Sequence, residues 1–237
     1  MNIVKEFNLN TKCSYLEDKD QITNYKVIHD CSTLECQEYI ERGFRRFGKM
    51  YFRPICEGCN ECQSIKIDVD NFSFSKSQRR VLKKAKNIKS YIQKPTLTQE
   101  HLDLFDKYHL YMRDKKEWEY TKATPQSYYS SFVDGHNEFG YEVLYFYEEK
   151  LIGVDLIDIL QDGISSIYFY YDTDFMEYSL GKLSLYNQIM FAKESKLKWI
   201  YLGYYVEDCP SLNYKTHYKP YLTLDGQPNL EEEFNYS

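Results

Sequence analysis

The feature that most constrains this chain is the stretch Arg42–Lys94, which concentrates positive charge in an otherwise acidic protein. It contains 14 basic and 4 acidic residues, a net charge of +10, whereas the whole 237-residue chain carries −6 and the remainder therefore −16. Its second part holds eight lysines and arginines, from Lys76 to Lys94, with no acidic residue among them. Charge gathered in this way is typical of a protein that binds a polyanion.

The second part of this stretch predicts a basic helix that begins at Ser75 or Ser77 and extends to about Ile88. Ordinary solvated helices mix both signs of charge, so eight basic residues without an acid favour nucleic-acid phosphates as the partner. The alternative is a solvent-exposed helix with no partner. The predicted phosphate-binding residues cover one broad face of the helix: Arg79, Arg80, Lys83, Lys84 and Lys86.

The first part of the stretch holds three cysteines at CxxCxxC spacing: Cys56, Cys59 and Cys62. Thiolates at this spacing bind zinc or iron–sulfur clusters, and Cys13 is a candidate fourth ligand. Reduced thiols without a metal are the alternative. The remaining cysteines have no partner spacing, and we interpret them as structural. The N-terminus shows no secretion signal and no run reaches the roughly 20 apolar residues of a membrane span, so we expect a soluble cytoplasmic protein without disulfides.

The order of elements predicts an α+β chain with a domain boundary at Pro95, where the charge character changes. A small cysteine-bearing domain would occupy residues 1–94 and a second domain residues 95–237. The capping-box spacing Ser32–Glu35 starts an early helix, and Thr98 caps another. Then come a hairpin turning at Glu148–Lys150, a third strand, a helix capped by Ser179 and a final strand. Three antiparallel strands, a helix and a strand form the core order of GNAT-type acyltransferases, an analogy of topology alone.

Two features of the second domain could carry chemistry. Leu180, Gly181 and Lys182 place backbone amides at a helix start, where amides bind anions or stabilise an oxyanion, although a plain helix start is the alternative. Asp172 is one of several acids near predicted strand ends that could orient an amine; the others are Asp155, Asp158 and Asp174. The chain lacks HExxH, GxSxG, P-loop and GxGxxG motifs, which argues against hydrolytic metal sites, nucleotide hydrolysis and nicotinamide chemistry.

Several segments together resemble the bacterial aminoacyl-tRNA–protein transferases over nearly the whole chain: CSYL, RGFRRFGKMYFRPICEGCNEC, SQRRVLKK, YYD, SLG, YLGYY and the late YK. The resemblance implies a cysteine-bearing domain joined to a GNAT-like transferase domain. It also implies transfer of an amino acid from tRNA to proteins that begin with Asp or Glu, which marks them for N-end rule degradation. Leu16 stands where the arginyl branch of the family carries a second cysteine, which favours leucyl-tRNA as the donor and weakens the carry-over of a metal site.

Within this family, the predicted roles follow from the reaction. The aminoacyl ester is already activated, so no cofactor is required for the chemistry, and a zinc ion or iron–sulfur cluster would be structural. Asp172 would orient the amine, the amides of residues 180–182 would stabilise the oxyanion, and the basic helix would hold tRNA. Arg45, Arg46 or Arg79 would pair with the acidic side chain of the acceptor. Aromatic strands, residues 145–147 and 168–171, would form the leucyl pocket.

Three alternatives remain open at this point. Arginyl transfer to the same acceptors would need an acidic group in the aminoacyl pocket. A non-enzymatic RNA-binding protein would explain the stretch Arg42–Lys94 and leave the second domain without a role. An acetyltransferase using acetyl-CoA would explain the topology, but neither the cysteines nor the basic helix.

Overall fold

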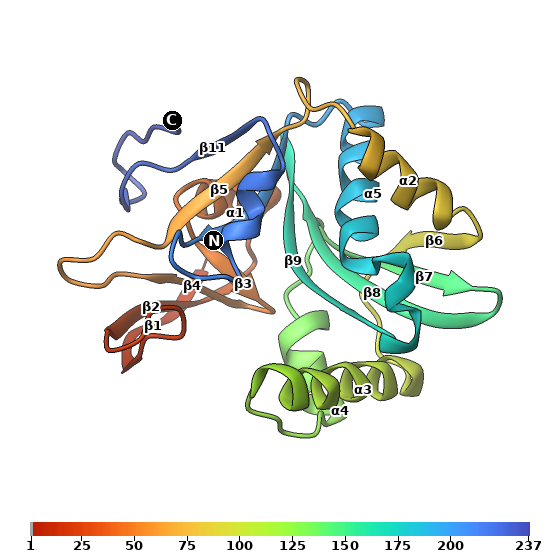
Figure 1. Cartoon of the computed structure of the whole chain (residues 1–237). Coiled ribbons are helices and arrows are strands. Elements are labelled where there is room, and N and C mark those ends of the chain that lie inside the picture. The colour runs from red at the N-terminus through yellow and green to blue at the C-terminus, as the bar shows by residue number, and fades with distance from the viewer. Residues whose placement is uncertain (1) are drawn as a thin grey trace.

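The computed structural model describes residues 2–237 and contains two β-sheets, with helices on both faces of the larger sheet (Figure 1). The α-helices are α1 (Thr33–Glu41), α2 (Lys76–Lys84), α3 (Gln99–Lys116), α4 (Pro125–Tyr128) and α5 (Leu180–Glu194). Three shorter helices are η1 (Tyr129–Val133), η2 (Thr173–Tyr178) and η3 (Asn213–His217). Among residues 2–237, no helix combines the length and the apolar character needed to cross a membrane.

The smaller sheet is built from the N-terminal part of the chain in the order β1-β2-β4-β3. Its strands are β1 (Asn2–Lys12), β2 (Asp20–His29), β3 (Arg45–Phe47) and β4 (Met50–Pro54), and all of its neighbours are antiparallel. Helix α1 starts at the predicted capping box, in which Ser32 accepts from the Glu35 amide and the Glu35 side chain accepts from Ser32. The buried side of α1 packs between this sheet and β10 of the larger sheet.

The larger sheet has the order β11-β5-β10-β9-β8-β7-β6. Its strands are β5 (Gln63–Asp68), β6 (Ile88–Gln93), β7 (Gly140–Tyr147), β8 (Lys150–Ile159), β9 (Gly163–Tyr171), β10 (Trp199–Tyr205) and β11 (Tyr221–Thr223). Every neighbouring pair is antiparallel except β9 and β10, which are parallel and pair only from Gly163 to Ser165 on β9. Beyond Ser165 the two strands are no longer paired.

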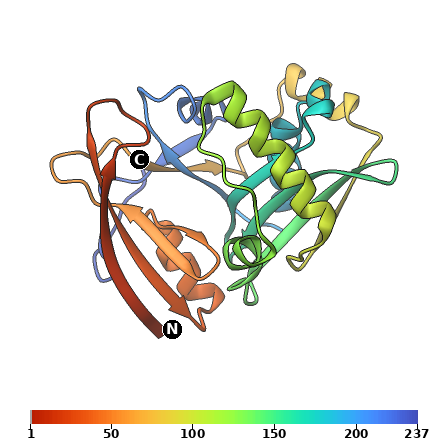
Figure 2. The same ribbon diagram turned by 90° about the horizontal axis from the view of Figure 1, so that it is seen from below.

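The two faces of the larger sheet bury different helices because successive strand residues point to opposite sides. Ile157 of β8 packs in the core with α5, whereas its neighbour Leu156 packs in the core with α3. Figures 1 and 2 show α5 and α2 on one side of this sheet and α3 crossing the other. The mixed α and β class, with the order of three antiparallel strands, a helix and a parallel strand, is therefore confirmed.

The division between the two sheets does not coincide with Pro95. Strands β5 and β6 precede Pro95, yet both belong to the larger sheet, where β5 pairs with β10 and β6 pairs with β7. The division of the chain into folding units at Pro95 stays a prediction. Two local expectations were wrong. The basic helix ends at Lys84 rather than near Ile88, because the chain turns there to form β6. Ser179 precedes α5 in a left-handed conformation and makes no side-chain cap.

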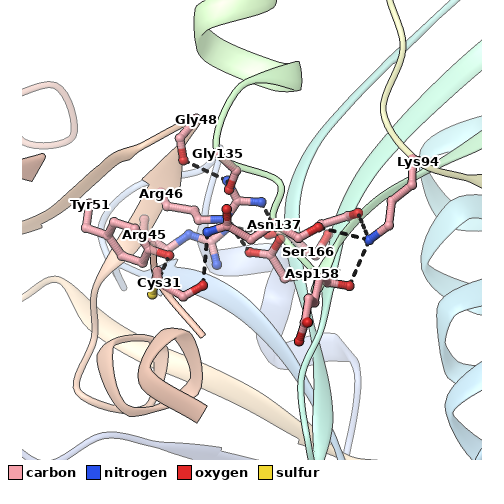
Figure 3. Close-up of polar contacts among 12 residues, drawn as sticks. Cys31, Arg45, Arg46, Gly48, Tyr51, Lys94, Gly135, Asn137, Asp158 and Ser166 are labelled. Atoms are coloured by element: carbon pink, nitrogen blue, oxygen red, sulfur yellow. Dashed lines mark hydrogen bonds and ion pairs between the residues drawn. The ribbon is translucent and has the colours of Figure 1, made fainter. Parts of the chain in front are cut away.

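A buried ion pair joins the two sheets (Figure 3). Arg46 of β3 reaches both carboxylate oxygens of Asp158 on β8, with Nε at 2.7 Å from Oδ2, and its Nη1 donates to the carbonyls of Gly48 and Gly135. The Arg46 side chain is 5% exposed and Asp158 is fully buried. A buried pair of this kind stabilises only while both partners are present, since the loss of one leaves an unpaired charge in the interior.

We expect Asp158→Asn to destabilise the protein by about 3–5 kcal/mol, because the buried Arg46 guanidinium would lose its counter-charge. Urea unfolding at neutral pH measures this change. The matched control is Asp20→Asn, which breaks the exposed pair between Lys12 and Asp20 and should leave the midpoint unchanged. Equal midpoints for both variants would show that the Arg46–Asp158 pair does not hold the sheets together.

Candidate functional site

A cavity of about 350 Å³ lies at the start of helix α5. Its size falls within the range of small-molecule sites in proteins. Its walls come from the end of β9, from η2 with the turn into α5, and from η3 near the C-terminus. The lining residues are Tyr171, Met176, Ser179, Leu180, Gly181, Lys182, Tyr214 and Tyr218. All three residues predicted at this helix start, Leu180, Gly181 and Lys182, therefore lie in the cavity wall.

The turn into α5 leaves two backbone amides without partners. The left-handed Ser179 directs its carbonyl into the first turn, where it accepts from the amides of Lys182 at 2.8 Å and Leu183 at 3.0 Å. Within the described part of the chain, the amides of Leu180 and Gly181 form no hydrogen bond, as expected for the first residues of a helix. The predicted oxyanion donors are thus reduced to Leu180 and Gly181, because the Lys182 amide is already occupied.

Gly181 keeps this part of the cavity open. A Cβ atom added at this position would meet no atom within 4 Å. The absence of a side chain therefore does not serve packing, and a substrate group can approach the free amides closely.

Asp172 does not line the cavity. It is 2% exposed and accepts hydrogen bonds from Lys107 of α3 and from Lys150 at the start of β8, the latter at 2.7 Å. Burial raises the pKa of Asp172, but the hydrogen bonds from the two lysines outweigh it and hold the pKa below its usual value. Its carboxylate is therefore already neutralised by two ammonium groups. The role of Asp172 in orienting an amine stays a prediction, and this pairing argues against it.

The basic helix α2 presents its charged side to solvent. All five predicted phosphate-binding residues are exposed, four of them on α2 and Lys86 in the turn that follows it. Val81 and Leu82 pack against the core that contains α5. Lys84 forms an ion pair with Glu177 of η2 at 3.1 Å, which places this end of α2 beside the cavity residues Met176 and Ser179. The other four form no ion pair within residues 2–237.

Of the three candidate acceptor-binding arginines, Arg79 is exposed on α2, whereas the guanidinium groups of Arg45 and Arg46 are buried in different surroundings. Each guanidinium nitrogen of Arg46 has a hydrogen-bond partner, and its charge is paired with Asp158, which argues against a role in binding an acceptor carboxylate. Arg45 donates through Nη2 to the carbonyl of Ser166, while its Nη1 is buried and has no partner in the described residues. Of the two buried candidates, Arg45 is the one with a nitrogen available to an acceptor, and Figure 3 shows the two side chains next to each other. The choice among the three arginines stays a prediction.

The four candidate metal ligands lie in one region. Burial, followed by the proximity of Cys13, Cys56 and Cys59, raises the pKa of the Cys62 thiol to about 12. Thiols are the donors that zinc and iron–sulfur clusters prefer. However, among residues 2–237 no three side chains meet with the geometry of a metal site. The metal stays a prediction, and no step described below depends on it.

The aromatic strands contribute only partly to the cavity. Tyr171 lines it, whereas Tyr145 is buried beneath α5 and Tyr168 stacks on Phe132 at the opposite face of the sheet. Sequence reasoning placed Tyr171 among the pocket residues but missed Tyr214 and Tyr218. The late YK segment was the only sequence signal for this region. The fold brings η3 to the cavity, and no local sequence pattern indicates that position.

Two further ionisable groups are buried: Lys215, which no sequence pattern indicated, and Asp155, one of the acids predicted as candidates for orienting an amine. Lys215 of η3 is 8% exposed and donates to the carbonyl of Tyr204 on β10. Asp155 of β8 is fully buried and accepts from Ser184 at 2.6 Å and from Gln188 at 2.9 Å, both on α5. Burial raises the pKa of Asp155 to about 7, against the opposing effect of these two hydrogen bonds.

The Asp155 carboxyl should make the stability of the protein fall as pH rises. In the unfolded chain it ionises near pH 4, while in the folded protein it keeps its proton to about pH 7, so stability is lost across that window and constant above it. Between pH 6.0 and 8.5 the remaining loss is about 1.4 kcal/mol, relative to Asp155→Asn, which cannot ionise. Urea unfolding of both proteins at the two pH values measures it.

The exposed variant Asp20→Asn serves as the control, and its pH dependence should follow that of the unchanged protein. If Asp155→Asn and the unchanged protein lost the same free energy of unfolding between the two pH values, Asp155 would be ionised in the folded state throughout.

Comparison with known proteins places this geometry in a family. Residues 11–80 match the family model described as arginine-tRNA-protein transferase, N terminus, and residues 100–225 match the model described as arginine-tRNA-protein transferase, C terminus. The gap between the two matches contains Pro95.

Curated relatives extend the match to nearly the full chain. An aspartate/glutamate leucyltransferase of Helicobacter hepaticus is 46% identical over 98% of this chain and 96% of its own. The protein of the same name from Campylobacter jejuni is 49% identical over 94% of each chain. A relative of that name from Vibrio cholerae is 30% identical over 92% of each.

Solved structures show more distant likeness. FemX aligns with 77% of this chain and 63% of its own, at 8% identity and a TM-score of 0.46. The structure of L-PGS from Bacillus licheniformis aligns with 61% of this chain and 47% of its own, at 14% identity and a TM-score of 0.45.

Proposed function

The chain belongs to the arginine-tRNA-protein transferase family, and from this premise we propose that it transfers leucine from leucyl-tRNA to the α-amine of proteins that begin with Asp or Glu. An enzyme of this family is an aminoacyltransferase. The relatives that carry the name aspartate/glutamate leucyltransferase support the choice of leucine and of acidic acceptors. The product would carry an N-terminal leucine, which fits the marking of proteins for N-end rule degradation.

The observation that carries this proposal is the character of the cavity wall. None of its lining residues is acidic, and its only charged side chain is that of Lys182. An arginyl group would require a carboxylate partner when it leaves water, whereas a leucyl group needs only apolar contacts. Met176, Leu180 and the three tyrosines supply such contacts. The cavity thus suits an uncharged aminoacyl group, and it suits leucine better than arginine.

The reaction requires little beyond positioning and charge stabilisation. The amine nitrogen attacks the ester carbonyl, a tetrahedral oxyanion forms, and the bond from carbon to the tRNA ribose oxygen breaks. The amine loses a proton and the ribose hydroxyl gains one. Because an α-amine has a pKa near 8, a useful fraction is neutral at pH 7. Holding amine and ester together can lower the barrier by on the order of 7–11 kcal/mol.

In the proposed complex, the free amides of Leu180 and Gly181 donate to the carbonyl oxygen of the aminoacyl ester. Backbone donors fixed at a helix start stabilise a developing oxyanion because they do not reorganise during the reaction. The partial positive charge of the α5 N-terminus acts in the same direction. Both effects strengthen as the oxygen becomes an anion, so they favour the transition state over the bound ester.

The exposed basic face of α2 would hold the tRNA. Lys84 connects this face to the wall of the cavity through Glu177, so a tRNA bound along α2 would place its aminoacyl end near the start of α5. Exposed lysines and arginines contact phosphates without reading sequence. This arrangement gives both halves of the chain a role, which a non-enzymatic RNA-binding protein would not.

A transfer assay tests the proposed function. The protein is mixed with radiolabelled leucyl-tRNA or arginyl-tRNA and with peptides that begin with Asp, Glu, Asn or Lys. We expect leucine to move to the Asp and Glu peptides only. Transfer of arginine would leave the reaction in place and overturn the donor, whereas no transfer from either tRNA would overturn the enzyme.

The variant Gly181→Phe connects this activity to the cavity. The added ring has open space to occupy, so the fold should be kept while the aminoacyl group is excluded. We expect leucyl transfer to fall on the order of 100-fold with tRNA binding unchanged. Full activity of Gly181→Phe would place the reaction elsewhere on the molecule.

Charge reversal on α2 should weaken tRNA binding. The double variant Arg79→Glu with Arg80→Glu should lower the affinity for leucyl-tRNA roughly tenfold or more, because two phosphate contacts become repulsive. The slope of log affinity against log salt should fall by about 1 for each lost contact. Binding is measured by filter retention between 50 and 200 mM salt, the range over which such contacts weaken most clearly.

The matched control reverses the charge of two exposed lysines, one at the C-terminal end of α3 and one in the loop after it: Lys116→Glu with Lys122→Glu. It changes the net charge by the same amount and should leave affinity and slope nearly intact. An equal loss in both double variants would attribute the binding to net charge rather than to α2.

A further inference from the structure

Arg45 and Lys215 bring two positive charges together in the interior without an acidic partner. Arg45 lies against Gly203 of β10, and Lys215 donates to the carbonyl of the next residue, Tyr204. Within the described chain neither forms an ion pair with any carboxylate. The nearest charged carboxylate that attracts Arg45 is Asp158, and both of its oxygens are bound to Arg46.

The place of Arg45 follows from the separation of β9 and β10. The parallel pairing of these strands ends at Ser165, so the carbonyl of Ser166 has lost its partner strand. Arg45 Nη2 donates to that carbonyl, and the side chain lies across Gly203. A Cβ atom at Gly203 would lie 2.7 Å from Arg45 Nε, and the positive φ of +76° likewise requires glycine. The strand β10 is thus shaped to admit this guanidinium.

Part of the guanidinium is left unsatisfied. Arg45 Nη1 is buried and has no hydrogen-bond partner in residues 2–237. A buried donor of a charged group without a partner is costly, and native structures rarely retain one without a use. The free nitrogen marks the point at which an acceptor atom would be favourable.

Lys215 lies close enough to Arg45 for the two positive charges to repel each other. It belongs to η3, whose Tyr214 and the adjoining Tyr218 line the cavity, so the same short segment forms the cavity wall and carries the buried amine. Burial, followed by repulsion from Arg45, lowers the pKa of Lys215 to about 7. The amine therefore gains a full charge most readily when an anion is nearby.

We propose that Arg45 and Lys215 form the site that binds the side-chain carboxylate of the N-terminal Asp or Glu of the acceptor protein. The inference rests on the proposed function and names its specificity-determining residues. One carboxylate supplies the negative charge that both cations lack and the acceptor atom that Arg45 Nη1 lacks. The planar guanidinium and the ammonium together suit a group with two oxygens.

A side-chain carboxylate fits this site better than a tRNA phosphate does. The exposed residues of α2 would bind the tRNA backbone. They remain in water and can contact phosphates whatever the base sequence. Arg45 and Lys215 are instead shielded from water. A carboxylate at the end of a small, flexible side chain can reach such a buried site, whereas a polymer backbone cannot. Tyr214, the residue before Lys215, lines the cavity, so in the proposed complex the α-amine of the same acceptor residue would lie toward the aminoacyl ester.

Such a site discriminates strongly between Asp and Asn. A neutral amide of the same shape brings no charge and would leave two buried cations uncompensated, so the loss is larger than that of a missing surface contact. We expect the unchanged protein to prefer an Asp peptide over an Asn peptide by on the order of 100-fold or more in kcat/KM.

The test measures leucyl transfer to peptides that differ only in their first residue, Asp or Asn, for the variants Lys215→Met and Arg45→Gln. Each variant should lower kcat/KM for the Asp peptide on the order of 100-fold, with little change for the Asn peptide, so that the preference collapses. Affinity for leucyl-tRNA should be unchanged. The charge-keeping variants Lys215→Arg and Arg45→Lys should recover part of the preference. The control Lys122→Met removes an exposed charge and should keep the full preference for the Asp peptide.

Thermal unfolding separates this role from a structural one. Lys215→Met replaces a buried, unpaired cation with an apolar chain of similar length, so the melting temperature without substrate should stay the same or rise. The Asp peptide should raise the melting temperature of the unchanged protein but not that of Lys215→Met. A structural lysine would show the reverse: a lower melting temperature and an unchanged preference.

The outcomes distinguish this inference from the proposed function. If the unchanged protein transfers leucine to no acidic peptide, the proposed function fails. If it does so and both variants keep the preference for Asp over Asn, only the site at Arg45 and Lys215 fails. If either variant instead loses affinity for leucyl-tRNA with its preference intact, the two cations bind a tRNA phosphate, and the inference is overturned.

Discussion

The short parallel pairing of β9 and β10 is the constraint on which the rest of this structure depends. The two strands pair only from Gly163 to Ser165, so each has unpaired backbone groups beyond that point. Buried backbone groups need partners, and a sheet that opens in its middle must find them elsewhere. Here the N-terminal sheet supplies one, since Arg45 donates to the carbonyl of Ser166. The smaller sheet therefore contributes a side chain to the opening between β9 and β10, and under the proposed acceptor site it is part of that site.

The adjacent residue Arg46 holds that arrangement in place. Its contacts with Asp158, Gly48 and Gly135 attach β3 to β8 and to the loop after η1, and this fixes β3 in the position from which Arg45 enters the opening. Neighbouring strand residues point in different directions, so two successive arginines can have separate tasks. Every guanidinium nitrogen of Arg46 has a partner, whereas Arg45 Nη1 has none among residues 2–237. The same dipeptide thus combines an internal ion pair with a group that can bind a ligand.

Local patterns in the sequence predicted most of the elements but only part of the site. Capping at Ser32 and Thr98, the hairpin at Glu148–Lys150 and the helix after Ser179 follow from short-range rules, and each element is present. Strand β6 was missed: the predicted helix extended to about Ile88, where the strand begins, and the basic segment after it was assigned no element. Lys215 was missed because nothing in its neighbours indicates burial. Its environment is created by β10, which is distant in the sequence, as is that of Asp155, whose partners come from α5.

In the proposed function, one acidic protein binds two anionic substrates, and the distribution of its positive charge suits both. A tRNA carries many phosphates and is bound through many weak contacts in water, each of which salt screens. A single carboxylate carries one charge. A protein can distinguish it from a neutral group only where the electrostatic interaction is strong, in an interior of low polarity. In the proposed complex, the exposed residues on α2 would meet the first requirement and the buried pair Arg45 and Lys215 the second. The two environments are not interchangeable. Buried cations could not contact a long tRNA backbone, and exposed cations would not distinguish an Asp side chain from an Asn side chain.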